Sequence, residues 1–320
     1  MTLRSVIIGT GSYLPKKRVT NYDLSQHLDT SHEWIMERTG ISARHIAAPE
    51  EYTSTMAIEA AQKALSAAQL TSKDIDMVIL ATSTPDHTFP STAIRVQEKL
   101  GISKGFAFDQ AAACSGFIFA LATADAYIKQ GMATTALVIG SETMSRLLDW
   151  TNRGTAVLFG DGAGAVVLQA QSQTDRGILG SLLRTNGSGY DQLYVNGGPS
   201  TTQTAGTIQM NGREVFRNAV TRLEEAAEDI LKIHGISQEE IDWLVPHQAN
   251  KRIIDATAKK LGLPDEKVIH TGENQANTSA ASIPLALDQA IKDGRIKKGD
   301  LILCESFAAG YAWGSNLIRM

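Results

Sequence analysis

The chain contains an internal repeat, and this repeat constrains its fold more than any other feature. Four segments of the first half return in the same order in the second half, at separations of about 160 residues. The matching pairs are residues 75–80 and 241–246, 99–101 and 260–262, 138–142 and 302–306, and, more weakly, 160–164 and 310–314. Chance can produce any one match, but four in register predict two similar halves, residues 1–171 and 172–320.

Each half alternates apolar segments of strand length with stretches of helical periodicity, which predicts an α/β fold. Amphipathic helices are expected at residues 57–70 and 215–234, each followed by a strand, a loop and a helix that ends in Lys-Leu-Gly. Two packed halves of this kind form a cleft between equivalent strand ends, where ligands usually bind. We therefore expect the functional residues in the loops that reach this cleft.

Composition predicts a cytoplasmic protein that does not cross a membrane. Of the 320 residues 43% are hydrophobic and 20% are charged, and no apolar run is long enough to span a bilayer. The apolar part of residues 1–9 is too short for a signal peptide. The two cysteines suggest no disulfide framework, which fits a reducing compartment. A net charge of −4 gives no general attraction for nucleic acid.

Cys114 is the first candidate for chemistry. It lies among small side chains in residues 110–117, directly before an apolar stretch of helical length. Near a helix N-terminus, unpaired backbone N–H groups favour a thiolate and can hold an oxyanion, and small neighbours let a substrate carbonyl approach. Simple packing is the alternative, because free cysteines are among the most buried residue types. Cys304, inside an apolar strand-like segment, is expected only to pack.

The second half supplies a histidine and an asparagine. His247 follows an apolar segment that ends at residue 246, so a strand end is expected to place its side chain in the cleft. A structural histidine is an equal alternative. Asn277 precedes a Thr-Ser-Ala-Ala-Ser run, and on its own it is better explained as a helix cap than as a catalytic amide.

Cysteine, histidine and asparagine in one cleft are compatible with two reactions. In a hydrolase, the histidine activates the thiol and the asparagine orients the imidazole. In a decarboxylating Claisen condensation, both side chains donate hydrogen bonds to a thioester carbonyl while the thiol carries an acyl group. Spacing in the sequence does not decide between them.

Other motifs are incomplete. Residues 9–14 lack the third glycine of a dinucleotide-binding loop, and the loop at 160–164 has no following Lys-Ser or Lys-Thr for a phosphate loop. The seven histidines are scattered and the two cysteines lie far apart in the sequence, so no metal site is expected.

The segments that hold these residues resemble the β-ketoacyl-acyl carrier protein (ACP) synthase III family, which initiates bacterial fatty acid synthesis. The resemblance runs the length of the chain. Its motifs are Ala-Ala-Cys-Ser-Gly at 112–116, Val-Pro-His-Gln-Ala-Asn at 245–250, Ala-Asn-Thr-Ser-Ala at 276–280, and the segments 30–35, 38–41, 153–155, 159–164 and 310–315. It implies a thiolase-like fold, with two similar halves in α/β/α/β/α layers, and a homodimer.

By this resemblance, Cys114 accepts the acyl group of acetyl-CoA or another short acyl-CoA. His247 and Asn277 bind the thioester carbonyl of malonyl-ACP during decarboxylation, and the resulting carbanion attacks the acyl-cysteine to give acetoacetyl-ACP, CoA and CO2. Backbone N–H groups of Cys114 and Ala309 form the implied oxyanion hole. No cofactor is implied, since both thioesters are substrates.

The resemblance also implies residues that bind CoA. Trp34 and Arg153 sandwich the adenine, Thr30 and Arg38 lie nearby, and Asn250 lies along the pantetheine arm. Stacking of an indole and a guanidinium on a base is physically reasonable.

Further implied residues contact the acyl chain and the carrier protein. Phe89 of one subunit walls the acyl pocket of the other, and Phe216 lines the entrance; ordinary packing is the alternative for both. The residues implied for ACP docking surround a local basic patch: Arg217, Gln248, Ala249, Asn250, Lys251, Arg252, Lys259 and Lys260. For Lys259 and Lys260 a solvated helix end is the alternative.

Three departures from the family pattern bear on specificity. Alanine replaces glycine at Ala276 and at Ala308 and Ala309, and His32 stands where an acidic residue is usual. Alanine keeps the backbone N–H but disfavours positive φ and adds a methyl group near the pocket, so the acyl-chain preference stays open. His32 is expected to alter contacts at the nucleotide end only.

Three other functions stay open at this point. A related condensing enzyme of secondary metabolism uses a longer or aromatic primer, and a Cys-His-Asn hydrolase transfers the acyl group to water. A non-enzymatic module that binds acyl-CoA or ACP is the third, and the intact Cys-His-Asn set disfavours it.

Overall fold

Two sheets of the same topology form the centre of the molecule. The computed structural model describes residues 3–320, so residues 1 and 2 of the expected N-terminal half lie outside the described range. The first sheet contains, in spatial order, β1 (Leu3–Tyr13), β7 (Asp161–Ser172), β6 (Thr135–Thr143), β4 (Met77–Ala81) and β5 (Phe106–Gln110). The second contains β8 (Gly177–Thr185), β13 (Ala312–Arg319), β12 (Leu301–Ala308) and β11 (Trp243–Pro246).

The two sheets match strand by strand. In the first, β4 runs parallel to β5 and β6, while β7 is antiparallel to β6 and β1. In the second, β11 is parallel to β12, and β13 is antiparallel to β12 and β8. Val268 bridges Leu244 of β11 in parallel, at the place that β5 takes beside β4. The predicted α/β fold of two similar halves is therefore confirmed; the boundary at residues 171 and 172, between β7 and β8, stays a prediction.

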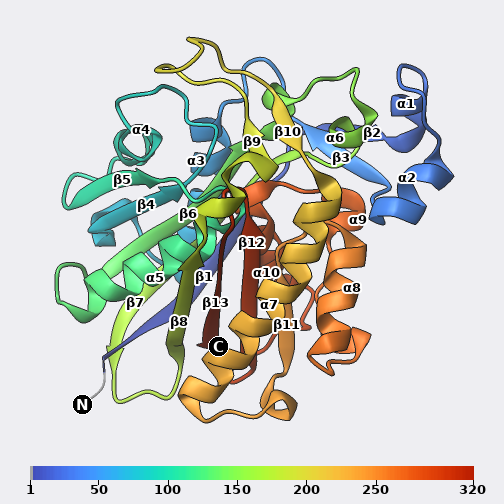
Figure 1. Ribbon diagram of the computed structural model, residues 1–320. Coiled ribbons are helices and arrows are strands. Elements are labelled where there is room, and N and C mark those ends of the chain that lie inside the picture. The colour runs from blue at the N-terminus through green and yellow to red at the C-terminus, as the bar shows by residue number, and fades with distance from the viewer. Residues whose placement is uncertain (1–2) are drawn as a thin grey trace.

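Six helices complete a five-layered arrangement (Figure 1). The outer pairs are α3 (Thr53–Ala68) with α4 (Thr92–Leu100), and α7 (Gly212–His234) with α8 (Lys251–Lys260). The inner pair is α5 (Gly116–Lys129) and α10 (Ser282–Lys292). Three buried apolar clusters join these layers, one beneath each outer pair and one around the inner helices between the sheets. The α/β/α/β/α order that the resemblance implied is thus confirmed.

The inner helices carry matching buried carboxylates, each paired with a partly exposed lysine. Asp125 of α5 accepts hydrogen bonds from Ser5 Oγ at 2.7 Å and from Lys129 Nζ at 2.6 Å. Asp288 of α10 accepts from Thr10 Oγ1 at 2.8 Å and from Lys292 Nζ at 2.7 Å. A carboxylate is costly to bury unless it is paired, so each pair joins an otherwise apolar helix to β1 at low cost.

Short elements surround one end of the sheets, at the top of Figure 1. Those at the upper right are α1 (Asn21–Ser25), α2 (His32–Thr39), α6 (Arg153–Ala156) and the antiparallel pair β2 (Lys17–Thr20) and β3 (Ala43–Ile46), which α1 and α2 connect. A hairpin pairs β9 (Leu193–Val195) with β10 (Ile208–Met210), and α9 (Gly272–Gln275) precedes the Asn277 loop. The fully buried Arg44 links these parts, donating to Asn21 Oδ1 at 2.9 Å and to the Val157 carbonyl at 2.8 Å.

The starts of the inner helices approach each other closely. A short 3₁₀ turn precedes each helix: η2 (Ala113–Ser115) before α5 and η7 (Ser279–Ala281) before α10. Gly140 of β6 lies beneath η7, where a Cβ atom would come within 2.2 Å of the Ala280 carbonyl oxygen. Glycine at this position therefore lets η7 pack directly on the sheet.

Ala276 has a backbone conformation that glycine normally adopts. Its φ is 59° and its ψ is −165°, and its side chain is fully buried. Non-glycine residues in this region are strained by roughly 1–3 kcal/mol. The conformation is held because the next residue, Asn277, forms backbone hydrogen bonds with Leu158 and Gly160. Ala308 and Ala309 are not among the residues of positive φ, so only Ala276 of the three alanines is strained.

Ala276→Gly is expected to destabilise the protein less than Ala281→Gly. Both replacements remove a fully buried methyl group and add the chain entropy of glycine, but Ala281 has an ordinary helical conformation, with φ −79°. Only the change at Ala276 relieves strain, so the free energies of unfolding of the two variants should differ by about 1–3 kcal/mol. Urea unfolding measures both. Equal losses of stability would show that Ala276 is unstrained.

Candidate active site

A cavity of 410 Å³ lies between α7, α8 and the loops at the ends of the strands. It brings together the three predicted catalytic residues, Cys114, His247 and Asn277. The other predicted site residues in its wall are Phe216, Ala249, Asn250 and Arg252. Apolar side chains cover most of the remaining wall: Leu158, Phe159, Leu193, Met210, Val215, Ala219, Leu223, Ile253 and Phe307.

Cys114 lies in η2, two residues before α5 begins, as the small-residue pattern predicted. Its side chain is only 7% exposed. The pKa of Cys114 is raised to about 12, chiefly by burial and to a smaller extent by the charge of Glu142, against the lowering effect of the Ser279 side chain. The expectation of a thiolate is therefore wrong for this state of the protein, because desolvation of the charged form outweighs the helix terminus.

His247 follows the end of β11, and its backbone N–H donates to the Glu305 carbonyl at 2.8 Å. Its Nδ1 lies 2.6 Å from Ser282 Oγ, the first side chain of α10. Its Nε2 is buried and has no hydrogen-bond partner. Burial lowers the pKa of His247 to about 3, so the imidazole is neutral at physiological pH. The ring thus presents one unpartnered nitrogen at the cavity.

Asn277 is fixed by its backbone and by its side-chain oxygen. Oδ1 accepts the backbone N–H of Ser279 at 2.9 Å, so the capping interaction considered from the sequence is present. The backbone forms a parallel bridge with Phe159. With Oδ1 occupied in this way, the amide nitrogen is the end of the side chain that can serve a ligand.

The turn between β12 and β13 is tied to the Cys114 segment. Ser306 Oγ donates to the Cys114 carbonyl at 3.0 Å, and Ser115 Oγ donates to the Ala312 carbonyl at 2.9 Å. Ala308 and Ala312 pack with Cys114 in a small buried cluster. Ala309 follows β12 in this turn, so the two predicted oxyanion-hole residues belong to segments that are bonded to each other.

Sequence reasoning missed three polar residues at this site. Glu142 of β6 is fully buried and accepts hydrogen bonds from Ser279 Oγ at 3.0 Å and from Thr84 Oγ1 at 2.6 Å. Ser282 holds His247, and Ser279 connects Glu142 with Cys114. In the sequence, Glu142 stands near the end of an apolar strand and was used only as part of the repeat match at 138–142; the two serines were visible only as part of a polar loop.

The predicted nucleotide-binding residues lie together, but not as a sandwich. Arg38 and Arg153 both contact the indole of Trp34, with guanidinium carbons 4.4 and 5.0 Å from the ring centroid. Two stacked contacts of normal length need about 7 Å, so no base fits between Trp34 and Arg153 in this arrangement. Arg153 is held there by Asp29, whose backbone oxygen lies at 2.6 Å. Thr30 beside it has a buried hydroxyl without a partner.

Asn250 and His32 have structural contacts of their own. Asn250 is the N-cap of α8, with Oδ1 accepting from the Arg252 backbone, and its Nδ2 donates to the Arg38 carbonyl at 3.0 Å. It therefore joins the cavity wall to α2. His32 begins α2 and stacks on Tyr22, with ring centroids 4.8 Å apart.

Gln248 cannot contact a carrier protein in this structure. Its side chain is 2% exposed, and its amide makes four hydrogen bonds to backbone groups, at Pro246, Ile269, Thr271 and Gly272. The prediction that placed it at the docking surface is wrong, because the polar side chain serves to join two loops behind the cavity.

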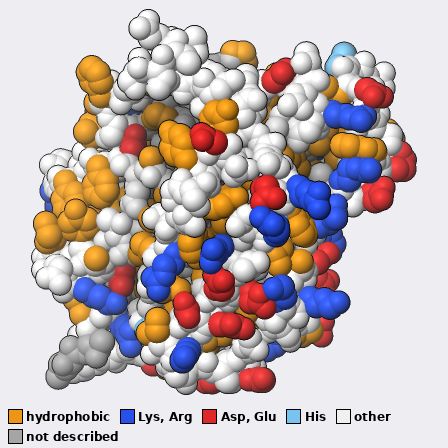
Figure 2. Space-filling model, viewed as in Figure 1, with side chains coloured by type: hydrophobic (Ala, Val, Ile, Leu, Met, Phe, Trp, Pro, Cys, Tyr) orange, Lys and Arg blue, Asp and Glu red, His pale blue; other side chains and the backbone are white. Residues whose placement is uncertain are grey.

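The predicted basic patch is exposed but partly neutralised. The exposed cations are Arg217, Lys251, Arg252, Lys259 and Lys260. Three of them pair with carboxylates on the same surface: Arg217 with Glu214, Lys251 with Asp255, and Lys260 with Glu224. Figure 2 shows acidic and basic side chains mixed over α7 and α8. Arg252 instead lies over the ring of Phe216, at 5.6 Å from its centroid.

Phe89 lies outside the cavity of its own chain. Its side chain is 83% exposed, in the loop between β4 and α4. A role in the pocket of a second subunit stays a prediction. Phe216, in contrast, lines the cavity directly.

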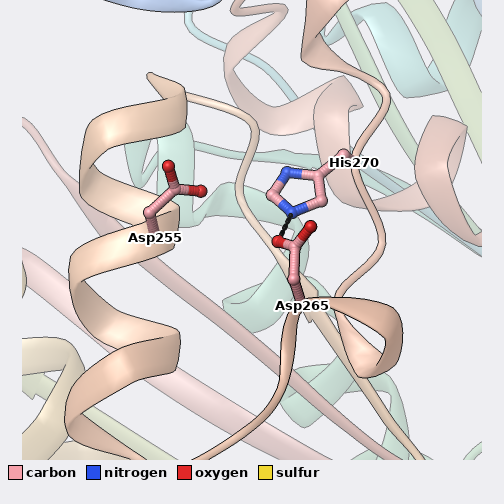
Figure 3. Close-up of side chains that lie close together, drawn as sticks. All are labelled: Asp255, Asp265 and His270. Atoms are coloured by element: carbon pink, nitrogen blue, oxygen red, sulfur yellow. Dashed lines mark hydrogen bonds and ion pairs between the residues drawn. The ribbon is translucent and has the colours of Figure 1, made fainter.

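Asp255, Asp265 and His270 form the one group of possible metal ligands found among residues 3–320 (Figure 3). Their ligand atoms lie within 4.8 Å of one another. Lys251 Nζ donates to both oxygens of Asp255, at 2.7 and 2.8 Å, and His270 Nε2 lies 2.9 Å from Asp265. These contacts already give each carboxylate a partner, and none of the three residues lines the cavity with Cys114.

Family models match two parts of the chain. A model described as 3-oxoacyl-[acyl-carrier-protein (ACP)] synthase III matches residues 108–187, and one described as its C-terminal part matches residues 231–320. The first includes Cys114 and the second includes His247 and Asn277. In the described part of the chain, no helix is both long and apolar enough to cross a membrane.

Relatives with this fold match over nearly the full length. A β-ketoacyl-[acyl-carrier-protein] synthase III of Erythrobacter litoralis is 58% identical over 319 residues, which cover 99% of each chain. The crystal structure of 3-oxoacyl-[acyl-carrier-protein] synthase III from Aquifex aeolicus is 48% identical and superposes with a TM-score of 0.94, covering 99% of this chain and 100% of that one. A priming β-ketosynthase of polyketide biosynthesis has the same TM-score but 33% identity, covering 99% of this chain and 96% of that one. The chain therefore belongs to the β-ketoacyl-[acyl-carrier-protein] synthase III family of condensing acyltransferases.

Proposed function

We propose that this chain moves a short acyl group from acyl-CoA to Cys114 and condenses it with malonyl-ACP, the initiating step of fatty acid synthesis. One observation supports this assignment above the others: a neutral thiol, an unpartnered imidazole nitrogen and an asparagine amide line a single apolar cavity. The thiol forms a thioester with the acyl group and releases CoA. Loss of CO2 from the malonyl group then leaves a carbanion, which attacks the acyl carbon and expels the Cys114 sulfur.

His247 and Asn277 stabilise the enolate formed by decarboxylation. Ser282 Oγ accepts the Gln248 N–H at 3.4 Å, so its own proton is available to His247 Nδ1. An imidazole that accepts at Nδ1 carries its proton at Nε2, which faces the substrate as a donor. The Asn277 amide is a second donor. Donors fixed before the reaction need no reorganisation as charge develops, and losing one typically costs roughly 3 kcal/mol of barrier.

The backbone N–H groups of Cys114 and Ala309 form the oxyanion hole for the acyl carbonyl. The two hydrogen bonds between their segments support this role, because they fix one donor relative to the other. Both reacting groups arrive as thioesters, so the reaction needs no cofactor. The two free cysteines fit a cytoplasmic location.

CoA binds along Trp34, Arg38, Arg153, Thr30 and Asn250. For the adenine to stack on the indole, the Arg153 guanidinium has to leave its present position over the ring. The exposed contacts of Arg153 with Asp29 make that movement inexpensive, because surface ion pairs contribute little. Phe216 and Arg252 line the entrance through which the pantetheine arm reaches Cys114.

Malonyl-ACP docks over the exposed basic residues Arg217, Lys251, Arg252, Lys259 and Lys260, with Ala249 and Asn250 at the cavity rim. A second copy of the chain pairs at β5. This strand is the edge of the first sheet, and the partly buried rings of Phe106 and Phe108 lie on it, so its unpaired backbone suits another strand. Phe89, exposed near this edge, then reaches the acyl pocket of the second copy.

The relatives favour the initiating synthase over the alternatives. Identity is 58% with a synthase III over nearly the whole chain but 33% with the priming ketosynthase of polyketide biosynthesis. A hydrolase requires the histidine to accept the thiol proton, whereas Ser282 already occupies the basic nitrogen. A non-enzymatic module that only binds acyl-CoA or ACP does not need a buried His247 Nε2 without a hydrogen-bond partner, so this feature favours an enzyme.

Replacement of two cavity residues, Cys114 and Asn277, should separate the two half-reactions. Cys114→Ser should abolish both the acetyl adduct, measured by intact mass spectrometry after addition of acetyl-CoA, and condensation with malonyl-ACP. Asn277→Ala should slow decarboxylation of the malonyl thioester by about 10²–10³-fold and affect acetylation less, because one enolate donor is lost. Asn274→Ala, three residues earlier in α9 and exposed at the surface, is the matched control. Equal loss of both half-reactions in Asn277→Ala would assign the asparagine a structural role.

Arg153→Ala should raise the KM for acetyl-CoA about five- to thirty-fold and leave kcat near its original value. One stacking contact with the nucleotide contributes about 1–2 kcal/mol to binding. The acetyl thioester of N-acetylcysteamine, which lacks the nucleotide, should react equally with both proteins. Arg146→Ala is the control, because Arg146 stacks on Tyr52 away from the cavity. An unchanged KM for acetyl-CoA would remove Arg153 from the binding site.

A further inference from the structure

A buried carboxylate lies behind the nucleophile, and the condensation as written above does not use it. Glu142 is inaccessible to solvent and has no cationic partner among its hydrogen bonds. Its oxygens accept from Thr82 Oγ1 at 3.1 Å, Thr84 Oγ1 at 2.6 Å, the Ser83 backbone N–H at 3.0 Å and Ser279 Oγ at 3.0 Å. Burying a charge with neutral donors alone is costly, so its presence beside the thiol requires an explanation.

Ser279 connects this carboxylate with the thiol. Its hydroxyl donates to Glu142 Oε1 at 3.0 Å. The turns η2 and η7, which carry Cys114 and Ser279, pack against each other, so the serine side chain lies beside the thiol. Its backbone, at φ 50°, donates to Asn277 Oδ1. With the Ser279 proton directed at Glu142, the lone pairs of the serine oxygen are available to the thiol, so a proton path from S–H through O–H to the carboxylate is open.

The other base in the cavity is poorly suited to the thiol proton. In the arrangement proposed above, Ser282 donates to His247 Nδ1, which lies 2.6 Å from its hydroxyl oxygen, and Nε2 carries the imidazole proton. Burial also lowers its pKa to about 3. Burial raises the pKa of Cys114 to about 12, so the thiol cannot ionise by itself at neutral pH. Burial raises the pKa of Glu142, which makes it a better proton acceptor than an exposed carboxylate.

We propose that Ser279 and Glu142 form a proton relay that activates Cys114. As the sulfur attacks the acyl-CoA carbonyl, the S–H proton moves to Ser279 Oγ while the Ser279 proton moves to Glu142. CoA leaves as a thiolate and takes a proton from solvent. When condensation later expels the Cys114 sulfur as a thiolate, the neutral Glu142 returns its proton through Ser279, so the enzyme regains its starting state.

This proposal rests on the proposed function only for the acylation step. Activation of the thiol itself is testable with iodoacetamide, which alkylates cysteine without CoA or ACP. Glu142→Gln and Ser279→Ala should each slow alkylation of Cys114 and its acetylation by acetyl-CoA at least tenfold at pH 7. Decarboxylation of the malonyl thioester, which transfers no thiol proton, should change much less. Asp125→Asn is the control, because it alters a buried carboxylate further along α5.

Two readouts distinguish a relay from a structural effect. The double variant Glu142→Gln, Ser279→Ala should be no slower than the slower single variant, since either change breaks the same path. The deficit in alkylation should also shrink as the pH rises from 7 to 9, because hydroxide can replace the lost acceptor. Among the titratable groups on the elements that pack against η2 and η7, Glu142 and His247 lie nearest the thiol. The others on these elements are Asp125, Tyr127, Lys129, Asp161, Asp288, Lys292, Cys304, Glu305 and Arg319.

The outcomes are decisive in either direction. Folded variants that alkylate at the wild-type rate, or single effects that multiply in the double variant, would overturn the relay. If Glu142→Gln does not fold, Ser279→Ala alone carries the test, since its backbone contacts are kept. If the wild-type protein is alkylated through the relay but is not acetylated by acetyl-CoA, the relay stands and the proposed function fails.

Discussion

The close contact between the starts of the two inner helices is the constraint on which the site depends. Gly140 has no side chain to separate η7 from β6, and a Cβ atom on Gly116 would lie 3.1 Å from Ala81 and 3.3 Å from Ala280. Larger side chains would move Ser279 away from both Cys114 and Glu142. The small residues around the nucleophile therefore serve packing as well as substrate access, because they let two segments from different halves meet at hydrogen-bonding distance.

The internal repeat supplies one scaffold, and the two halves use it differently. The loop after β4 carries Thr82 and Thr84, whose hydroxyls hold Glu142, whereas the equivalent loop after β11 carries His247. The turn before α5 carries the nucleophile, and the equivalent turn before α10 carries Ser279. One half thus provides the thiol and its buried carboxylate, and the other provides the donors. Asp125 and Asp288 both accept hydrogen bonds from hydroxyl groups of β1, so the inner helices of the two halves are anchored to this strand in the same way.

The sequence predicts most of the fold, because repeated strand and helix patterns are local. It also places Cys114, His247 and Asn277 at strand ends and helix starts, where topology brings them together. It does not predict burial at single positions. Gln248 follows a histidine in the cavity and resembles a surface residue until its four backbone hydrogen bonds are seen. The buried position of Glu142 cannot be predicted from the sequence either, because its hydrogen-bond partners come from segments about 60 and 137 residues away in the chain.

The neutral state of the site fits the reaction better than a charged one. The malonyl carboxylate enters as an anion and, on losing CO2, leaves its charge on the enolate oxygen. A cationic histidine would stabilise the starting carboxylate as well as the enolate, and uniform stabilisation does not lower the barrier. Burial keeps His247 neutral. Its fixed Nε2 donor therefore stabilises the enolate oxygen, on which charge develops, more than it stabilises the carboxylate anion elsewhere in the cavity. The same burial makes the thiol a poor acid, which is why a nucleophile at this position requires a nearby group to accept its proton.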